Sequence, residues 1–177
     1  MTVRLSELKQ RATDPHSWLE HAESLFLAAE ELAKALFSTC ALNAPSENRV
    51  LMLGLARGSM TLLGAGLECV LKAIAVSRGL LSETASGIAF SAALHGRDKH
   101  DLVAMAESLS LRLKSVEIDL LKRSTEYLRW AGRYPTALRL GRSAAAARQR
   151  ALNLKPNDLA VARGMALRAR TECGSAT

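Results

Sequence analysis

Three charged side chains interrupt the most apolar stretch of the chain, residues 50–76, and two of them stand close together after Arg57. Glu68 and Lys72 are four residues apart, so on a helix they lie on one face and can form an ion pair in the favourable order, acid first. A charge in such apolar surroundings must be paired or must face a cleft. Two interpretations follow: a partly buried ion pair that only stabilises the helix, or one wall of a binding site.

A histidine and an aspartate stand together where a helix is expected to begin. His100 and Asp101 follow a Ser- and Gly-containing stretch, and either side chain can accept a hydrogen bond from the unpaired N–H groups of a helix start. This pattern is typical of a helix cap, and a histidine here could also act as a catalyst. Arg97 and Lys99 directly before it would attract a phosphate group.

Residues 129–134 combine arginines with aromatic side chains at the end of a predicted helix. Arg129 and Arg133 flank Trp130, and Tyr134 follows. Bases stack on such aromatic rings beside guanidinium groups, so the cluster could hold a nucleotide. The alternative is that the two aromatic side chains anchor the turn to the core.

The positive charge of the chain is concentrated in its C-terminal third. Residues 123–177 hold eleven Lys or Arg against three acids, a net +8, whereas residues 1–122 hold thirteen against fourteen, a net −1. This asymmetry indicates an anionic partner such as a nucleic acid, although arginine-rich helix faces are also found simply exposed to solvent. Four further arginines could form the basic face: Arg139, Arg142, Arg148 and Arg150.

Several classes of protein do not fit the composition. The three cysteines are widely spaced and have no CxxC pairing, so we expect neither a zinc site, nor another metal or cofactor site, nor a disulfide framework. The apolar stretch is broken by charges well before the roughly 20 residues of a membrane span. Residues 1–12 have no apolar export segment. We therefore expect a cytoplasmic protein without a membrane segment.

The elements that must position these residues are helices. Ala, Leu, Arg, Glu and Ser dominate and β-branched and aromatic residues are scarce, which predicts an all-α, up-and-down bundle of about five main helices with a C-terminal helical extension. The expected units are a short N-terminal helix (1–16), the bundle (17–137) and a basic extension (138–177). The expected helices are 2–12, 17–42, 47–78, 101–109, 116–131, 136–154 and 157–171, with a connection over 80–99 that has one helical turn near 89–94.

Glycines lie inside the predicted helix 47–78. Each lowers helix propensity by roughly 1 kcal/mol relative to Ala. The four are Gly54, Gly58, Gly64 and Gly66. Their lack of a side chain allows another helix to approach closely, so Gly54, Gly58, Ala65 and their neighbours predict a tight crossing within the bundle or across a dimer. Gly79 is placed to cap the end of this helix.

The order of these motifs resembles the HEPN domain family over about residues 18–137. The resemblance rests on Glu68-x-x-x-Lys72-Ala73, then His100-Asp101-Leu102, then Arg133-Tyr134-Pro135. It implies a helical bundle that commonly dimerises and is associated with nucleotides, RNA or partner nucleotidyltransferases in toxin–antitoxin and defence systems. By motif, the residues carried over for nucleotide or RNA binding are Glu68, Lys72, His100, Asp101, Arg133 and Tyr134, and the cluster above adds Arg129.

The chain departs from the family at its catalytic motif. The resemblance implies that HEPN ribonucleases use an Arg followed, after four to six intervening residues, by a His on the same helix. The later helices predicted here lack that pair. Arg11 and His16 match by count alone, with Asp14 and Pro15 between them. We therefore expect a non-catalytic module that binds nucleotide or RNA, or docks with a nucleotidyltransferase, as a homodimer.

Two other functions stay open. One is a metal-independent ribonuclease in which His100 acts with Arg97, Arg129 or Arg133. The other is a structural adaptor that binds proteins through the glycine-containing helix and the arginine face.

Overall fold

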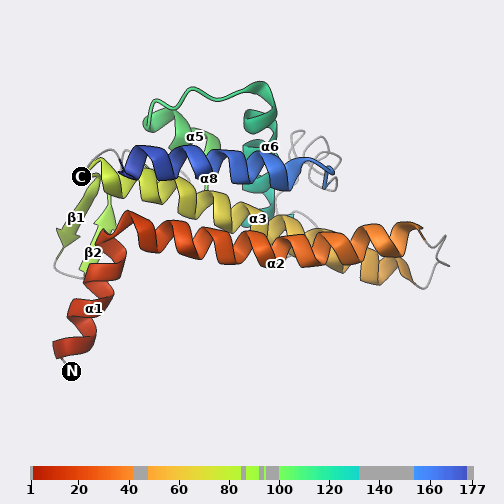
Figure 1. The fold of residues 1–177 in the computed structure, drawn as a ribbon, viewed down its shortest axis with the longest axis horizontal. Helices are drawn as coiled ribbons and strands as arrows, with labels where there is room; N and C mark the ends of the chain where they lie inside the picture. Colours follow the sequence, from red (N-terminus) through yellow and green to blue (C-terminus); the bar gives the residue numbers. More distant parts are fainter. Residues whose placement is uncertain are drawn as a thin grey trace.

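The chain is an all-α bundle with one short β-hairpin, as the composition predicts. The computed structural model describes residues 2–41, 48–84, 87–91, 94, 100–131 and 154–174. Figure 1 shows long helices lying along one axis, with shorter ones packed across them. The elements are α1 (Thr2–Thr13), α2 (Pro15–Ala41), α3 (Arg49–Ser77), β1 (Leu81–Thr84), β2 (Gly87–Phe90), α5 (Leu102–Ser108), α6 (Ser115–Glu126), the π-helical turn η2 (Tyr127–Ala131) and α8 (Asp158–Gly174).

The first helix ends where the sequence predicts, at Asp14. The Asp14 carboxylate accepts hydrogen bonds from the backbone N–H groups of His16 and Ser17, both at 3.0 Å, and from the Ser17 hydroxyl at 2.8 Å. Pro15 occupies the first position of α2, where its missing N–H is not needed. Because α1 and α2 meet in an elbow at this cap, Arg11 and His16 lie on different helices.

Helices α2 and α3 form the long antiparallel pair that the apolar periodicity predicts (Figure 1). On the core side of α2, Leu19, Phe26 and Leu36 are buried, whereas Cys40 near the end of the helix is exposed. In α3, burial is almost continuous from Ser59 to Ala75. The Ser59 hydroxyl donates to the Ala29 carbonyl at 2.9 Å, so the one polar group of this contact is satisfied.

The predicted close helix crossing exists, and it is tightest at the two glycines that flank Ala65. A Cβ at Gly66 would lie 2.8 Å from Cδ1 of Phe26, and a Cβ at Gly64 would lie 3.3 Å from the Ser124 carbonyl. At Gly58 only Leu32 is near, and at Gly54 nothing lies within 4 Å. Gly54 therefore takes no part in a crossing within the described bundle, because it lies on the exposed part of α3, and a crossing there with a second copy of the chain stays a prediction.

The connection after α3 contains a hairpin rather than only a loop with a helical turn. Gly79 ends α3 at φ +69°, as expected of a C-terminal glycine. Strands β1 and β2 then pair antiparallel, with Leu81 opposite Phe90. The predicted helical turn near 89–94 was wrong at its start, because residues 87–90 form a strand, whereas Leu94 is helical and buried.

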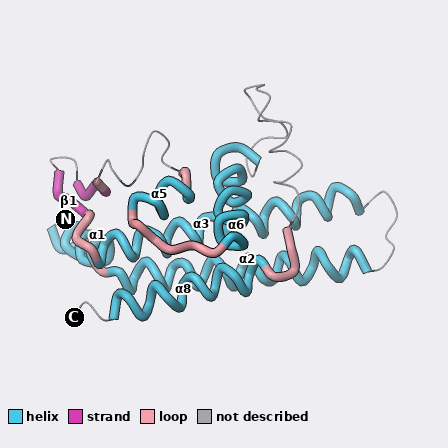
Figure 2. The backbone as a smooth tube through the Cα atoms, turned by 90° about the horizontal axis from the view of Figure 1, so that it is seen from above, coloured by secondary structure: helices cyan, strands magenta, loops and turns pink. Residues whose placement is uncertain are grey.

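The last helix is part of the core and not an appended extension. Helix α8 runs along α3 and α2 (Figures 1 and 2) and buries a stripe of small and apolar residues against them: Ala162, Met165, Ala166, Ala169 and Cys173. The predicted helix 136–154 lies outside the described residues, apart from Leu154. The predicted boundary at residue 138 therefore separates parts of the sequence that share one hydrophobic core.

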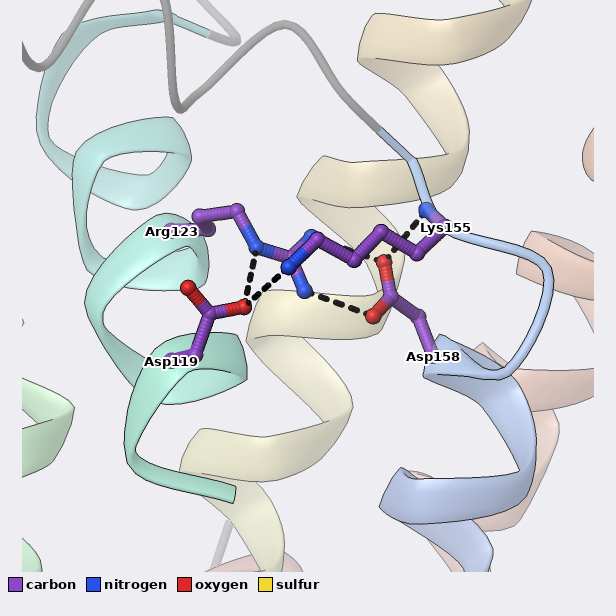
Figure 3. A network of polar contacts seen from close by, with 4 residues as sticks. All are labelled: Asp119, Arg123, Lys155 and Asp158. Carbon is purple, nitrogen blue, oxygen red and sulfur yellow. Dashed lines mark hydrogen bonds and ion pairs between the residues drawn. The ribbon is translucent and has the colours of Figure 1, made fainter. Parts of the chain in front are cut away.

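A buried ion cluster fixes the start of α8 to α6, as Figure 3 shows. Arg123 is bidentate to Asp158, at 2.6 and 2.7 Å, and only 3% and 5% of the two side chains is exposed. Asp119 also accepts from Arg123 at 3.0 Å and from Lys155 at 2.8 Å. This geometry satisfies both buried charges, as a charge removed from water requires.

Helix α3 is long and apolar enough to cross a membrane by length and composition alone. Its most apolar window is 78% buried inside the protein. A helix that crossed a membrane alone would leave its apolar side chains exposed to lipid. The burial of α3 is instead typical of the central helix of a bundle.

Candidate functional site

The Glu68–Lys72 ion pair predicted from the sequence forms, and a third residue joins it. Lys72 Nζ lies 2.7 Å from Glu68 Oε1, and His100 Nδ1 lies 3.1 Å from the other oxygen, Glu68 Oε2. Exposure rises across the three side chains, from 11% for Glu68 to 19% for Lys72 and 40% for His100. The carboxylate is thus held inside while the imidazole reaches solvent.

Two aromatic rings that the sequence analysis did not single out surround the ammonium group. Lys72 Nζ lies 5.3 Å from the ring centroid of Trp18 in α2 and 5.6 Å from that of Phe90 in β2. The two rings pack edge to face, with centroids 5.6 Å apart. The rings and the carboxylate both attract the ammonium group at this half-buried position. The predicted helix 17–42 contains Trp18, but no sequence signal indicated its contact with Lys72.

Asp101 has two roles. Its Oδ1 accepts the backbone N–H of Ala104 at 3.1 Å, which confirms the predicted helix cap. Its Oδ2 accepts from Arg129 at 2.9 Å, and Arg129 also lies 3.8 Å from Glu126 Oε1. The α5 start is fixed to α6 as well, because the Leu102 N–H donates to the buried Thr125 hydroxyl at 3.1 Å.

Together these contacts form one network from three parts of the sequence. We call Glu68, Lys72, His100, Asp101 and Arg129 the polar network; α3 supplies the first two, the residues before α5 the next two and η2 the last. The backbone connects its two ion-paired halves, because His100 and Asp101 are adjacent. Five of the seven predicted site residues are thus brought together.

The other predicted residues lie outside the described part of the chain. Arg133 and Tyr134 of the Arg-Tyr-Pro motif, the arginine face over 139–150, and Arg97 and Lys99 are all in this group. The backbone of Trp130 belongs to η2, but its side chain is not described.

The charges of the network nearly cancel. Glu68, Asp101 and the neighbouring Glu126 face two permanent cations, Lys72 and Arg129, so electrostatic attraction alone would not bring a phosphate here. Lys72 has three donors, of which the Glu68 contact uses one.

The nearest thiol is not a nucleophile. Burial raises the pKa of Cys69 to about 11, the Lys72 charge lowers it and the Glu68 charge raises it further. At neutral pH the group is therefore a protonated thiol within α3, and the thiolate that reacts is almost absent.

Among the residues that the structure describes, no group of three or more His, Cys, Asp or Glu side chains is placed to hold a metal ion. No family model, curated protein or solved structure matches the chain. Fold and site therefore define this protein by its structure alone, as an all-α bundle with a half-buried polar network where α3, α5 and η2 meet.

Proposed function

We propose that this chain is a non-catalytic, HEPN-like cytoplasmic module that binds RNA or a nucleotide through the polar network. The observation that carries the proposal is the convergence of Glu68–Lys72, His100–Asp101 and Arg129. They stand up to 61 residues apart in sequence and share hydrogen bonds and ion pairs.

The sequence after η2 supplies the attraction that the network lacks. Residues 132–153 contain five arginines and no acid. We propose that the arginines provide salt-dependent attraction to phosphates and that the network contacts sugar and base edges.

Assembly is part of the same proposal. A homodimer or a complex with a nucleotidyltransferase would fit the HEPN resemblance. Several large apolar side chains on the described parts of α2 and α3 are exposed and available to either partner: Leu27, Phe37, Val50, Leu51 and Leu53.

One contact favours the ribonuclease as a second candidate. His100 is half-exposed and its Nδ1 faces a buried carboxylate, an arrangement that orients an imidazole for proton transfer. In that case His100 would take the proton from the ribose 2′-hydroxyl, and Arg129 would stabilise the negative charge on the phosphate.

The test is binding of labelled single-stranded RNA and of ribonucleotides across a salt series, with cleavage products followed on a gel. We expect RNA to be retained intact with a steep salt dependence. Arg129→Gln and Lys72→Met should each weaken binding by about tenfold, because each removes a charge-assisted contact. Arg133→Ala tests the motif residue outside the described part of the chain.

Arg170→Gln is the matched control, since Arg170 is exposed on α8 and its loss changes the net charge equally. It should leave binding almost unchanged. Equal losses in Arg170→Gln and Arg129→Gln would mean that only net charge matters. RNA cleaved by the parent protein but not by His100→Ala would replace the binding module by the ribonuclease, and absence of all binding would leave the protein adaptor.

A further inference from the structure

A cleft of about 740 Å³ opens at the elbow between α1 and α2. Its described lining is Arg11, Ala12, Ser17, Trp18, Glu20 and His21. This volume is in the range of small-molecule sites, which run from about 300 to 1,000 Å³. In Figure 1, α1 turns away from the line of α2 beside the β1–β2 hairpin, so the elbow lies at the same end of the bundle as the hairpin.

The indole of Trp18 belongs to both the cleft and the surroundings of the polar network. It lines the cleft, and its ring lies 5.3 Å from Lys72 Nζ. Two contacts fix the orientation of the indole: its Nε1 donates to the Ala12 carbonyl at 3.0 Å, and its ring packs edge to face on Phe90. A rigid aromatic wall beside a paired lysine is suited to stacking against a flat ring.

The cleft also carries cationic and hydrogen-bonding groups. Arg11 and His21 are exposed, and neither side chain forms a hydrogen bond or ion pair with another described residue. Glu20 is the acid of the lining, and the Ser17 hydroxyl already donates to Asp14. An arginine with all its donors available, next to an aromatic wall, fits a ligand that joins a flat ring to an anion.

We infer that this cleft is the base-binding subsite of the proposed nucleotide site. The base stacks on Trp18, Arg11 and His21 contact a phosphate, and the ribose points along Trp18 toward Lys72. This inference rests on the proposed function, and it adds α1 and the start of α2 to a site that the motifs assign only to α3, α5 and η2. The ligand class is a ribonucleotide with an unpaired base, either free or at the end of a single-stranded RNA.

Fluorescence of Trp18 tests the stacking directly. The chain has two tryptophans, so Trp130→Phe leaves Trp18 as the one reporter. Each of the four ribonucleoside 5′-monophosphates is titrated into this full-length variant, with inorganic phosphate as the probe that lacks a base. We expect quenching by at least one nucleotide and none by phosphate. A short single-stranded RNA added in parallel distinguishes a free nucleotide from an RNA end by which probe binds more tightly.

Affinity measured by calorimetry supplies the second readout. Trp18→Leu should weaken nucleotide binding by about tenfold, because stacking on one aromatic ring accounts for a loss of that order. Arg11→Gln and His21→Gln should weaken it several-fold without affecting the fold, because both side chains are exposed. They keep the test valid if Trp18→Leu fails to fold. Arg170→Gln, far along the sequence on α8, should bind as the parent does.

The outcomes distinguish a failure of this inference from a failure of the proposed function. Nucleotide binding that depends on Lys72 and Arg129, with no Trp18 quenching and no effect of Arg11→Gln, overturns the cleft and leaves the proposed function in place. Quenching by inorganic phosphate alone also overturns it, because the cleft would then bind an anion without a base. No binding of any nucleotide or RNA overturns both.

Discussion

At the scale of single residues, two neighbouring hydroxyl groups illustrate opposite states of a buried polar group. Thr125 is buried and its hydroxyl accepts the Leu102 N–H. Tyr127 is completely buried, and its hydroxyl has no hydrogen-bond partner among the residues that the structure describes. Burial raises the pKa of Tyr127 to about 12, although the charges of Arg57 and Arg123 act to lower it. The two groups should therefore contribute to stability with opposite signs.

We predict that Tyr127→Phe leaves the free energy of unfolding unchanged or raises it by up to about 1 kcal/mol, because it removes an unsatisfied buried group. Thr125→Val should lower it by about 1 to 3 kcal/mol, because the Leu102 N–H then loses its acceptor. Urea unfolding followed by circular dichroism measures both. A loss in Tyr127→Phe as large as that in Thr125→Val would mean that the tyrosine hydroxyl has a partner after all.

The difference between local contacts and contacts across the fold limits what the sequence can predict about a site. The Glu68–Lys72 pair follows from helix spacing, because both residues belong to one element. The contacts of His100 with Glu68 and of Trp18 with Lys72 join residues 32 and 54 positions apart, and depend on how the elements pack. Such contacts have no local signal in one sequence, so the sequence could place these residues on helices but not in one network.

At the scale of elements, long periodic helices were predictable and short, irregular ones were not. The stripe of α2 and the glycine that ends α3 locate these helices within a few residues. The β1–β2 hairpin lies in a Ser- and Gly-containing stretch, and its Phe90 packs on Trp18 of a distant helix. The π-helical turn η2 has no known single-sequence signature. The core stripe of α8, by contrast, is visible in the sequence as small residues three and four apart. The basic charge of the C-terminal region favoured its interpretation as an extension outside the bundle.

Two glycines of α3 give a matched test of the helix crossing. Gly66→Ala should destabilise the protein by about 1 to 3 kcal/mol, because the added Cβ would lie 3.2 Å from the Ala22 carbonyl and closer still to the Phe26 ring. Gly54→Ala should stabilise it by up to about 1 kcal/mol, because nothing lies near and alanine favours the helix.

Thermal or urea unfolding of the two variants and the parent measures the difference. If Gly54→Ala is the more damaging substitution, the exposed face of α3 is covered in solution, for example by a second copy of the chain.

At the scale of the whole molecule, α8 closes the bundle through charges as well as apolar contacts. Its ion pairs reach three other parts of the chain: Arg163 with Glu30, Arg168 with Glu117 and Glu172 with Arg78. Pairs with exposed partners contribute little each. The buried Arg123–Asp158 contact matters more, because loss of either partner would leave an uncompensated charge in the core. Asp119 lies at the outer side of that contact, where solvent pH can act on it.

The pH dependence of stability should report on this junction. Hydrogen bonding from Lys155 lowers the pKa of Asp119 below its ordinary value of 3.8; burial opposes this, and the hydrogen bond and charge of Arg123 lower it further. Because the pKa is lower in the folded state, the contribution of Asp119 is fully present above 3.8 and is lost as the pH falls through the folded value. We expect the free energy of unfolding to be flat near neutral pH and to fall as the pH approaches and passes below 3.8.

Asp119→Asn should lower stability at neutral pH and make this acid loss shallower, because one of the responsible carboxylates is gone. Glu107→Gln is the matched control, since that side chain is exposed and forms no contact with another described residue; its acid profile should follow the parent. Urea unfolding from neutral pH down to about pH 3 gives both slopes. Equal slopes in Asp119→Asn and the parent would assign the acid sensitivity to the other carboxylates with lowered pKa values, Asp14 at the α1–α2 elbow and Glu30 beside Arg163. The α6–α8 junction would then hold the bundle together independently of pH.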